Sequence, residues 1–376
     1  MFGGDFMSEV LVVNHSELVE IVKKVYEEKL STFIWGRTGV GKSQSVRRAA
    51  KEIAEKYGLK YVEWPNWSDP RTEFVLIDIR LSHVEPSDLI GMPKLVDEEG
   101  VTKWYAPNWL KAISKEKEKE LGIKIRGILF LDELNLAPPL VQNASYQLVL
   151  DRRLGEVEVA DGIAIIAAGN LTEDQAYTFD MPLPLRTRFV HATLRPPTID
   201  EWVEWAKENG IDSRIIAFLK MQPSMLFKEM SEDRTFPTPR GWEFASKLIA
   251  NERDAKKAAM YVAMACGVVA GTQFKAFLKL SETIDLKELL ENPERFDSLS
   301  MDIKYSAVVN MPELLISDRK MASKLLKFAV AIPPEFAVLL LMSMKQVMGE
   351  EAFKDALKRF RGSEAKELIK LIRFLL

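Results

Sequence analysis

The chain has 376 residues, with 52 Lys and Arg against 55 Asp and Glu, so its formal net charge is −3 and its pI is near 5.9. This length is long for one domain, and a hydrophobic content of 47% is enough for more than one core. The charge balance argues against a general nucleic-acid binder, and a single cysteine, Cys266, excludes an internal disulfide and a cysteine-based metal cluster. The sequence shows no secretory signal and no membrane-spanning stretch, which predicts a cytoplasmic protein.

The first predicted element is an amphipathic helix over residues 14–30, in which apolar side chains recur at helical spacing. Asn14, with Glu17 three residues later, predicts a cap at the start of this helix. The apolar run 32–35 then predicts a short strand, and residues 44–56 predict a second helix. A strand and a helix therefore flank the glycine-rich segment between them.

That segment fits the phosphate-loop pattern G-x-x-x-x-G-K-[ST] at every fixed position, and it reads Gly36-Arg37-Thr38-Gly39-Val40-Gly41-Lys42-Ser43. Its glycines let the backbone turn tightly and aim successive N–H groups at one anion. Lys42 would reach the β- and γ-phosphates of a nucleotide, and the Ser43 hydroxyl would bind Mg²⁺. The helix that starts at Gln44 would present the positive end of its dipole to the same phosphates.

Two further strands are predicted at residues 60–63 and 74–81, followed by a hairpin of residues 94–96 and 101–105. Such a hairpin would project from the core, where it either touches a partner or is only a decorated loop. A charged, solvated helix is expected over residues 109–121.

A second motif lies at the end of a buried strand. Four apolar residues in a row, 128–131, predict a strand covered on both faces, as in a parallel sheet. Asp132 would then hold Mg²⁺ through water, and Glu133 would polarise the attacking water. Another buried strand is predicted at 163–168, and Asn170 follows it where an α/β sheet meets its ligand. Its amide either acts on the water or the γ-phosphate, or makes only an Asx turn.

The remaining candidates are arginines. Arg186 and Arg188 precede a last predicted strand, and the pair Pro196-Pro197 marks a domain boundary. Only helical patterns follow, including one buried helix over 258–274. Arg240 lies in the first turn of a predicted helix, where a cation opposes the helix dipole, so a compensating anion is expected nearby.

These motifs together resemble AAA+ ATPases of the MoxR type, a group that also contains dynein-like and restriction-GTPase relatives. The resemblance covers about residues 14–250, and its most specific part is the Asp-Glu-x-Asn-x-Ala-Pro-Pro run that begins at Asp132. It also rests on the phosphate loop, Asp-Leu-Ile-Gly-Met-Pro at 88–93, Ala-Gly-Asn at 168–170 and Leu-Arg-Thr-Arg-Phe at 185–189. Beyond residue 250 the family pattern is lost.

The resemblance implies an α/β protein with an αβα P-loop NTPase sandwich, a parallel five-stranded sheet, a helical lid and a C-terminal helical region. Residues 1–196 would form the nucleotide-binding domain, 197–285 the lid and 286–376 a region that docks a partner. A ring, usually a hexamer, would bind ATP and Mg²⁺ and act on a protein client or a von Willebrand factor A-type partner.

The same resemblance assigns roles residue by residue. Lys42 and Ser43 would belong to the Walker A motif, with the rest of the loop and Gln44 around the phosphates. Asp132 and Glu133 would form the Walker B motif. Asn170 would be the first sensor.

Arg188, or as a second choice Arg186, would be the finger that reaches the γ-phosphate bound by a neighbouring subunit. Such a finger is worth ~10³–10⁵ in rate, so a monomer should hydrolyse poorly. Arg240 would be the second sensor, with the phosphates as its anion. An ordinary surface ion pair is the alternative for Arg186 and Arg188.

The leading hypothesis is therefore a Mg²⁺-dependent ATPase that remodels a protein partner. One alternative is a slow nucleotide-dependent scaffold or switch. Another is a nucleic-acid-linked ATPase or GTPase motor, which the acidic pI disfavours. The motifs contact only phosphates, so they leave the choice between ATP and GTP open, together with ring size and client.

Overall fold

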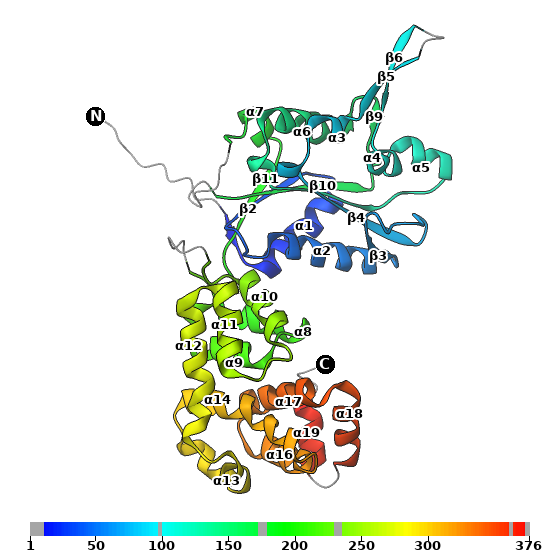
Figure 1. Ribbon diagram of the computed structural model, residues 1–376. Helices are drawn as coiled ribbons and strands as arrows, with labels where there is room; N and C mark the ends of the chain where they lie inside the picture. The colour runs from blue at the N-terminus through cyan, green and yellow to red at the C-terminus, as the bar shows by residue number, and fades with distance from the viewer. Residues whose placement is uncertain (1–10, 97–99, 172–178, 229–234, 361–363, 373–376) are drawn as a thin grey trace, which may run out of the picture. The chain divides into compact units, whose positions relative to one another are not determined.

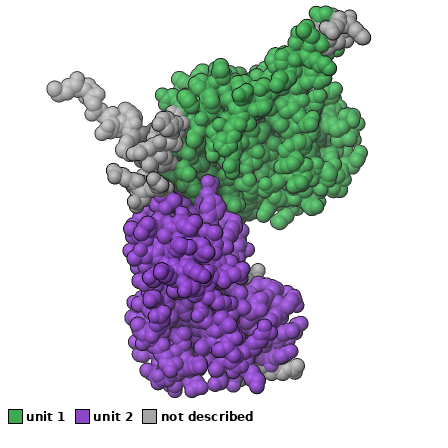
Figure 2. All heavy atoms as spheres, viewed as in Figure 1, with its two compact units in different colours: residues 1–196 green, residues 197–376 purple. Residues whose placement is uncertain are grey.

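The computed structural model describes residues 11–96, 100–171, 179–228, 235–360 and 364–372. The chain divides into two compact units, which we call unit 1 (Met1–Pro196) and unit 2 (Pro197–Leu376); Figure 1 shows their elements and Figure 2 their extents. Each unit has its own buried apolar core and is described by itself. Within the described ranges, no helix has the length and apolar character needed to cross a bilayer.

Unit 1 is built on a seven-stranded sheet in which every neighbouring pair of strands is parallel. Its order is β1 (Val12–Val13), β11 (Val190–Leu194), β2 (Thr32–Gly36), β10 (Ile163–Gly169), β7 (Gly127–Asp132), β4 (Glu73–Arg80) and β3 (Lys60–Glu63). The predicted parallel αβα P-loop fold is confirmed. The sheet is wider than the five strands expected, because β3 extends one edge and the two-residue β1 extends the other.

Helices cover both faces of this sheet (Figure 1). On one face lie α1 (His15–Glu27) and α2 (Lys42–Lys56), and on the other lie α3 (Pro86–Ile90), α6 (Pro139–Asp151) and α7 (Leu183–Arg186). The central strands β7 and β10 are buried along their whole length, which explains their continuous apolar sequence. The predicted cap of α1 is present, since the Asn14 and Glu17 side chains each accept a bond from the other's backbone N–H.

Unit 1 carries two hairpins outside the main sheet. The predicted hairpin consists of β5 (Met92–Val96) and β6 (Val101–Tyr105), and it projects from the rest of the unit in Figure 1. A smaller one pairs β8 (Arg153–Leu154) with β9 (Val157–Glu158). The helix expected over 109–121 is two helices, α4 (Asn108–Ala112) and α5 (Lys115–Leu121), because Ser114 between them caps the second one.

Unit 2 is helical throughout its described part. Its α-helices are α8 (Ile199–Glu208), α9 (Ser213–Met221), α10 (Pro239–Ile249), α11 (Ala255–Cys266), α12 (Val268–Lys279), α13 (Leu286–Glu291), α14 (Met301–Asn310), α15 (Leu314–Ser317), α16 (Met321–Ala331), α17 (Pro334–Met348), α18 (Glu350–Arg359) and α19 (Glu364–Ile372). One buried cluster runs from Trp202 to Leu368, across the boundary predicted at residue 285. The division into a lid and a C-terminal region is therefore a proposal about function, and the two parts share a core.

The stretch 258–274 is not the single buried helix predicted from its composition. The chain breaks at Gly267, whose φ of 91° lies in a region that favours glycine, and α11 and α12 pack against each other. At Gly271 a Cβ would lie 2.5 Å from the Ala259 carbonyl oxygen, so glycine permits this close approach. Cys266 is buried as expected, and burial raises the pKa of its thiol.

Candidate functional site

The phosphate loop joins β2 to α2 at the carboxyl edge of the sheet. Gly39 and Gly41 have φ angles of 77° and 104°, which a residue with a side chain adopts only with strain. His15 of α1 supports the loop, since its Nε2 lies 2.8 Å from the Val40 carbonyl oxygen. A Cβ on Gly41 would approach this same ring nitrogen to 2.9 Å. Both glycines are therefore required for the turn, and Gly41 is also required for its contact with α1.

Lys42 is the central cation of the site. It is the first residue of α2, and it is only 8% exposed. The ammonium donates to the carbonyl oxygens of Gly36, at 2.6 Å, and Arg37, at 3.1 Å. It also donates to Asn170 Oδ1 at 2.9 Å. The lysine is thus held inside its own loop, with the predicted first sensor as one of its partners.

The acid at the end of β7 lies beside the loop. Ser43 Oγ donates to Asp132 Oδ2 at 2.9 Å, although β10 separates β2 from β7 in the sheet. The other oxygen, Asp132 Oδ1, accepts from the Glu133 backbone N–H at 3.0 Å. This contact brings together the hydroxyl and the carboxylate that the sequence assigned to one metal ion.

Glu133 follows in a left-handed backbone conformation, with a φ of 59° that non-glycine residues rarely adopt. Its Oε2 accepts a hydrogen bond from the Ser82 hydroxyl. Ser82 lies in the turn Leu81–His83 directly after β4, and β4 pairs with β7 so that Arg80 is opposite Asp132. Sequence reasoning missed Ser82; the only available signal was a hydroxyl just past the end of a strand adjacent to β7.

Asn170 is fixed by a second buried asparagine. Asn135 Nδ2 donates to the Asn170 carbonyl oxygen at 2.8 Å, and the Asn170 N–H donates to Asn135 Oδ1 at 3.0 Å. Asn135 is 2% exposed, and a Cβ on Gly169 would lie 2.3 Å from its Oδ1. These two hydrogen bonds hold the backbone of Asn170, and its side chain is directed at Lys42.

A group of charged side chains lies beside the acids, between α2 and the sheet edge. Arg47 of α2 donates to Asp78 at 2.7 Å and to Glu63 at 3.1 Å. Burial raises the pKa of Asp78, the attraction of Arg47 opposes that rise, and the negative charge of Asp132 adds to it. A cation placed at Asp132 would reduce this repulsion between carboxylates, so the electrostatics of the edge suit a divalent metal ion.

The described residues contain no group of three or more His, Cys, Asp or Glu side chains that could hold a metal by themselves. Mg²⁺ does not need such a cage, because it is commonly bound by one or two protein oxygens together with water and phosphate oxygens. The Ser43 hydroxyl and the Asp132 carboxylate are oxygen donors of that kind, 2.9 Å apart. The donor set therefore fits Mg²⁺ bound with a nucleotide.

The predicted arginines lie in two different places. Arg186 ends α7 and Arg188 lies in the turn before β11; both side chains are exposed and form no ion pair with a described residue. Arg240 belongs to unit 2, where it is exposed in the first turn of α10. Its role as second sensor is thus a proposal. Of the other loop residues, Thr38 and Gln44 are exposed.

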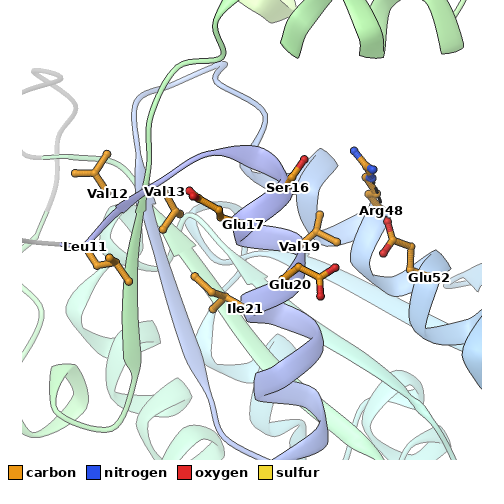
Figure 3. A pocket seen from close by; sticks show the side chains of 10 residues that line it. All are labelled: Leu11, Val12, Val13, Ser16, Glu17, Val19, Glu20, Ile21, Arg48 and Glu52. Carbon is orange, nitrogen blue, oxygen red and sulfur yellow. Dashed lines mark hydrogen bonds and ion pairs between the residues drawn. The ribbon is translucent and has the colours of Figure 1, made fainter.

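A hollow of about 630 Å³ lies elsewhere on unit 1 (Figure 3). Figure 3 shows that its side chains come from the β1 segment, α1 and α2, and they are Leu11, Val12, Val13, Ser16, Glu17, Val19, Glu20, Ile21, Arg48 and Glu52. It contains none of the predicted site residues. Its two α2 side chains, Arg48 and Glu52, already form an ion pair at 3.1 Å.

No family model matches the chain, and no curated protein matches it. Among solved structures, NtrX from Brucella abortus in complex with ADP is 16% identical, with a TM-score of 0.33 over 96% of this chain and 68% of that chain. The Aeropyrum pernix ORC2 protein is 14% identical, with a TM-score of 0.39 over 98% of this chain and 89% of that one. A point mutant of Thermotoga maritima RuvB is 14% identical, with a TM-score of 0.29 over 94% and 92%. Likeness at this level is distant, so function must be inferred from the residues of this chain.

Proposed function

We propose that this chain is a Mg²⁺-dependent ATPase of the AAA+ class, and that its motifs make it of the MoxR type. The observation that carries the proposal is the 2.9 Å hydrogen bond between Ser43 Oγ and Asp132 Oδ2. It places the two expected metal ligands side by side, although they come from different elements and lie far apart in the sequence. Gly39 and Gly41 hold the backbone of the adjacent loop in the turn that a triphosphate requires.

In this proposal each polar side chain has a distinct task. The Lys42 ammonium binds phosphate oxygens in exchange for some of its present carbonyl partners. Asn170, held by Asn135, keeps its amide beside that ammonium, where it contacts the γ-phosphate or the attacking water. Glu133 accepts the proton of the water once its carboxylate has left Ser82. Ser43 and Asp132 would hold Mg²⁺, which would supply positive charge to the phosphate oxygens.

We further propose that the protein acts as an oligomeric ring, by family resemblance a hexamer, that remodels a protein client or a von Willebrand factor A-type partner. The support is the exposure of Arg186 and Arg188, which have no described ion-pair partner within their own chain. A slow nucleotide-dependent switch is the second candidate. The Ser82 contact favours it, because it occupies the proposed base before that base can accept a proton from the attacking water.

A Lys42→Ala variant tests the proposed activity directly. We expect its ATP hydrolysis to fall by ~10²–10³-fold, because a buried cation that contacts the transferred group is lost. Nucleotide affinity should fall with it, and chelation of Mg²⁺ should stop turnover of the wild type. Phosphate release and binding of a fluorescent ATP analogue are the measurements.

The matched control is Lys51→Ala, which removes an exposed lysine of the same helix. It should keep wild-type turnover. Hydrolysis by Lys42→Ala at the wild-type rate would rule out the proposed ATPase.

Ser82 offers a second test, on the resting rate. Its hydroxyl stabilises one orientation of the Glu133 carboxylate, and a hydrogen bond to a charged group is worth ~1.5–3 kcal/mol at most sites. Only part of this free energy separates the two orientations of the Glu133 carboxylate. We therefore expect Ser82→Ala to raise basal turnover by about 3- to 10-fold. Steady-state phosphate release without any partner is the measurement.

Ser82→Thr keeps the hydroxyl and should keep the low basal rate. A basal rate that falls in Ser82→Ala would mean that the serine assists Glu133 and does not restrain it.

A further inference from the structure

A chain of two hydrogen bonds joins the strand before the phosphate loop to the arginine turn, residues 186–188. Trp35 is the residue of β2 directly before Gly36, and its Nε1–H donates to His191 Nδ1 at 2.9 Å. His191 lies in β11, and its Nε2 is 2.7 Å from the Arg186 carbonyl oxygen. The bonds therefore connect the residue before the phosphate loop, through one imidazole, to the turn that carries the proposed finger.

These partners define the protonation of His191. An indole can only donate, so Nδ1 must accept; a carbonyl can only accept, so Nε2 must carry the hydrogen. The neutral imidazole with its hydrogen on Nε2 is the one form that makes both bonds. It uses the full capacity of the ring, which has no other donor or acceptor.

Aromatic packing holds the imidazole in this position. Its ring is nearly coplanar with that of Trp35, at an interplanar angle of 21° and with centroids 6.1 Å apart, as the hydrogen bond between the two ring edges requires. It also lies 5.9 Å from the Phe33 ring and 6.3 Å from the Phe189 ring. Phe33 and Phe189 are themselves buried and make an edge contact at 5.5 Å. A ring that is bonded to Trp35 and packed by Phe33 and Phe189 has little freedom to follow the turn, so the turn is held by the ring.

The turn also has local bonds of its own. Helix α7 is four residues long, and its carbonyl groups accept from Thr187, Arg188 and Phe189 within the same segment. Within the backbone, the Arg186 carbonyl accepts from the Phe189 N–H at 3.3 Å, which is longer than its bond to His191. The imidazole thus makes the shorter of the two described bonds that fix this carbonyl.

We propose that His191 is a positioning residue: anchored on Trp35, it fixes the turn so that Arg186 and Arg188 are presented to the site of a second copy of this chain. This inference rests on the proposed function, because it concerns the same arginines. It adds a connection within one subunit, from Trp35 before the phosphate loop to the arginines that this subunit supplies to its neighbour.

The test compares His191→Ala, His191→Gln and the control Thr193→Val in the full chain. In the assembled protein we expect kcat of His191→Ala to fall by ~10- to 100-fold, because small misplacement of a catalytic group has effects of this size. Affinity for ATP should stay within about twofold, since the loop keeps its own contacts. His191→Gln restores the hydrogen that reaches Arg186 and should recover most of kcat.

Thr193 lies on the same strand, opposite Trp35, and its hydroxyl has no partner among the described residues. Thr193→Val should therefore behave as wild type. An unchanged kcat in His191→Ala, with an active wild type, would overturn the inference and leave the ATPase proposal standing. A wild type without turnover would overturn both.

A mixing experiment separates positioning from general damage. His191→Ala subunits keep their own site, whereas Glu133→Gln subunits cannot turn over but supply intact arginines. A mixture should exceed the activity of His191→Ala alone. No gain, with mixed assembly confirmed by mass spectrometry, would mean that the defect lies in the subunit's own site and would overturn the inference.

Nitrogen NMR of the imidazole rings provides a readout independent of activity. The chain has three histidines, so His191 can be assigned by its loss in the alanine variant. We expect the form with hydrogen on Nε2, and a shifted Nδ1 resonance in Trp35→Phe, which lacks the donor. Hydrogen on Nδ1 in the wild type would contradict both bonds and the proposed role.

Discussion

A Glu133→Gln variant should bind ATP as tightly as the wild type and hydrolyse it ~10³-fold more slowly, because a general base typically contributes ~10²–10⁴-fold. Glutamine keeps the shape of glutamate, and its amide oxygen can still accept from Ser82, so the end of β7 should keep its geometry. The contact between Ser43 and Asp132 is unaffected. Single-turnover hydrolysis and equilibrium binding of nucleotide, measured on the same preparation, check both halves of this expectation.

The control is Glu116→Gln, an exposed glutamate of α5 that should have no effect. If Glu133→Gln kept more than about a tenth of the wild-type rate, the general base would have to be another group. A loss of ATP affinity equal to the loss of rate would instead assign Glu133 to binding.

The same variant distinguishes remodelling of a partner from a slow switch. With ATP it should stay in the nucleotide-bound state, so a client that binds in that state should be retained on affinity purification. Lys42→Ala is the matched bait, since it should not hold the nucleotide. We expect a protein that is enriched only with Glu133→Gln and ATP, and that accelerates turnover of the wild type. A switch would retain a partner without this acceleration.

The parts of the site that could be read from the sequence are those encoded by neighbouring residues. The turn of the phosphate loop depends on glycines within eight consecutive positions, Gly36 to Ser43, and its positive φ angles follow from that composition. The buried runs before Asp132 and Asn170 predict central parallel strands, and the carboxyl ends of such strands meet at one edge. The cap formed by Asn14 and Glu17 is likewise local.

The contacts that sequence reasoning missed are those set by strand order and by side-chain packing. Ser82 reaches Glu133 only because β4 lies next to β7, and the sequence leaves the order of the strands open. The bond from His191 to Arg186 depends in the same way on the packing of a ring against β2. The strand β1 was missed because two residues, Val12 and Val13, are too short to show alternation.

Replacing the arginines one at a time should identify the finger. We expect Arg188→Ala to lower kcat of the assembled protein by ~10³-fold or more, the range for a guanidinium that neutralises charge on the transferred phosphoryl group. Arg186→Ala should cost less, since the proposed function takes Arg188 as the finger and Arg186 as the second choice. Nucleotide affinity should be nearly unchanged in both variants, because neither side chain lies in its own subunit's phosphate loop. Turnover at protein concentrations above and below assembly is the measurement, with the exposed Arg71→Ala as control.

The decisive step is to mix two inactive variants. Arg188→Ala subunits retain their own Lys42, Ser43 and Asp132 but lack the finger, whereas Lys42→Ala subunits bind no nucleotide but carry both arginines. If the arginine acts in trans, mixed assemblies place an intact finger beside an intact loop, and activity returns although neither parent is active. If it acts in cis, no mixture of these subunits contains a complete site and activity stays absent. Neither variant can regain its missing side chain, so restored turnover has no source other than a site shared by two subunits. The result therefore decides between a subunit interface that completes catalysis and an arginine that serves only its own chain.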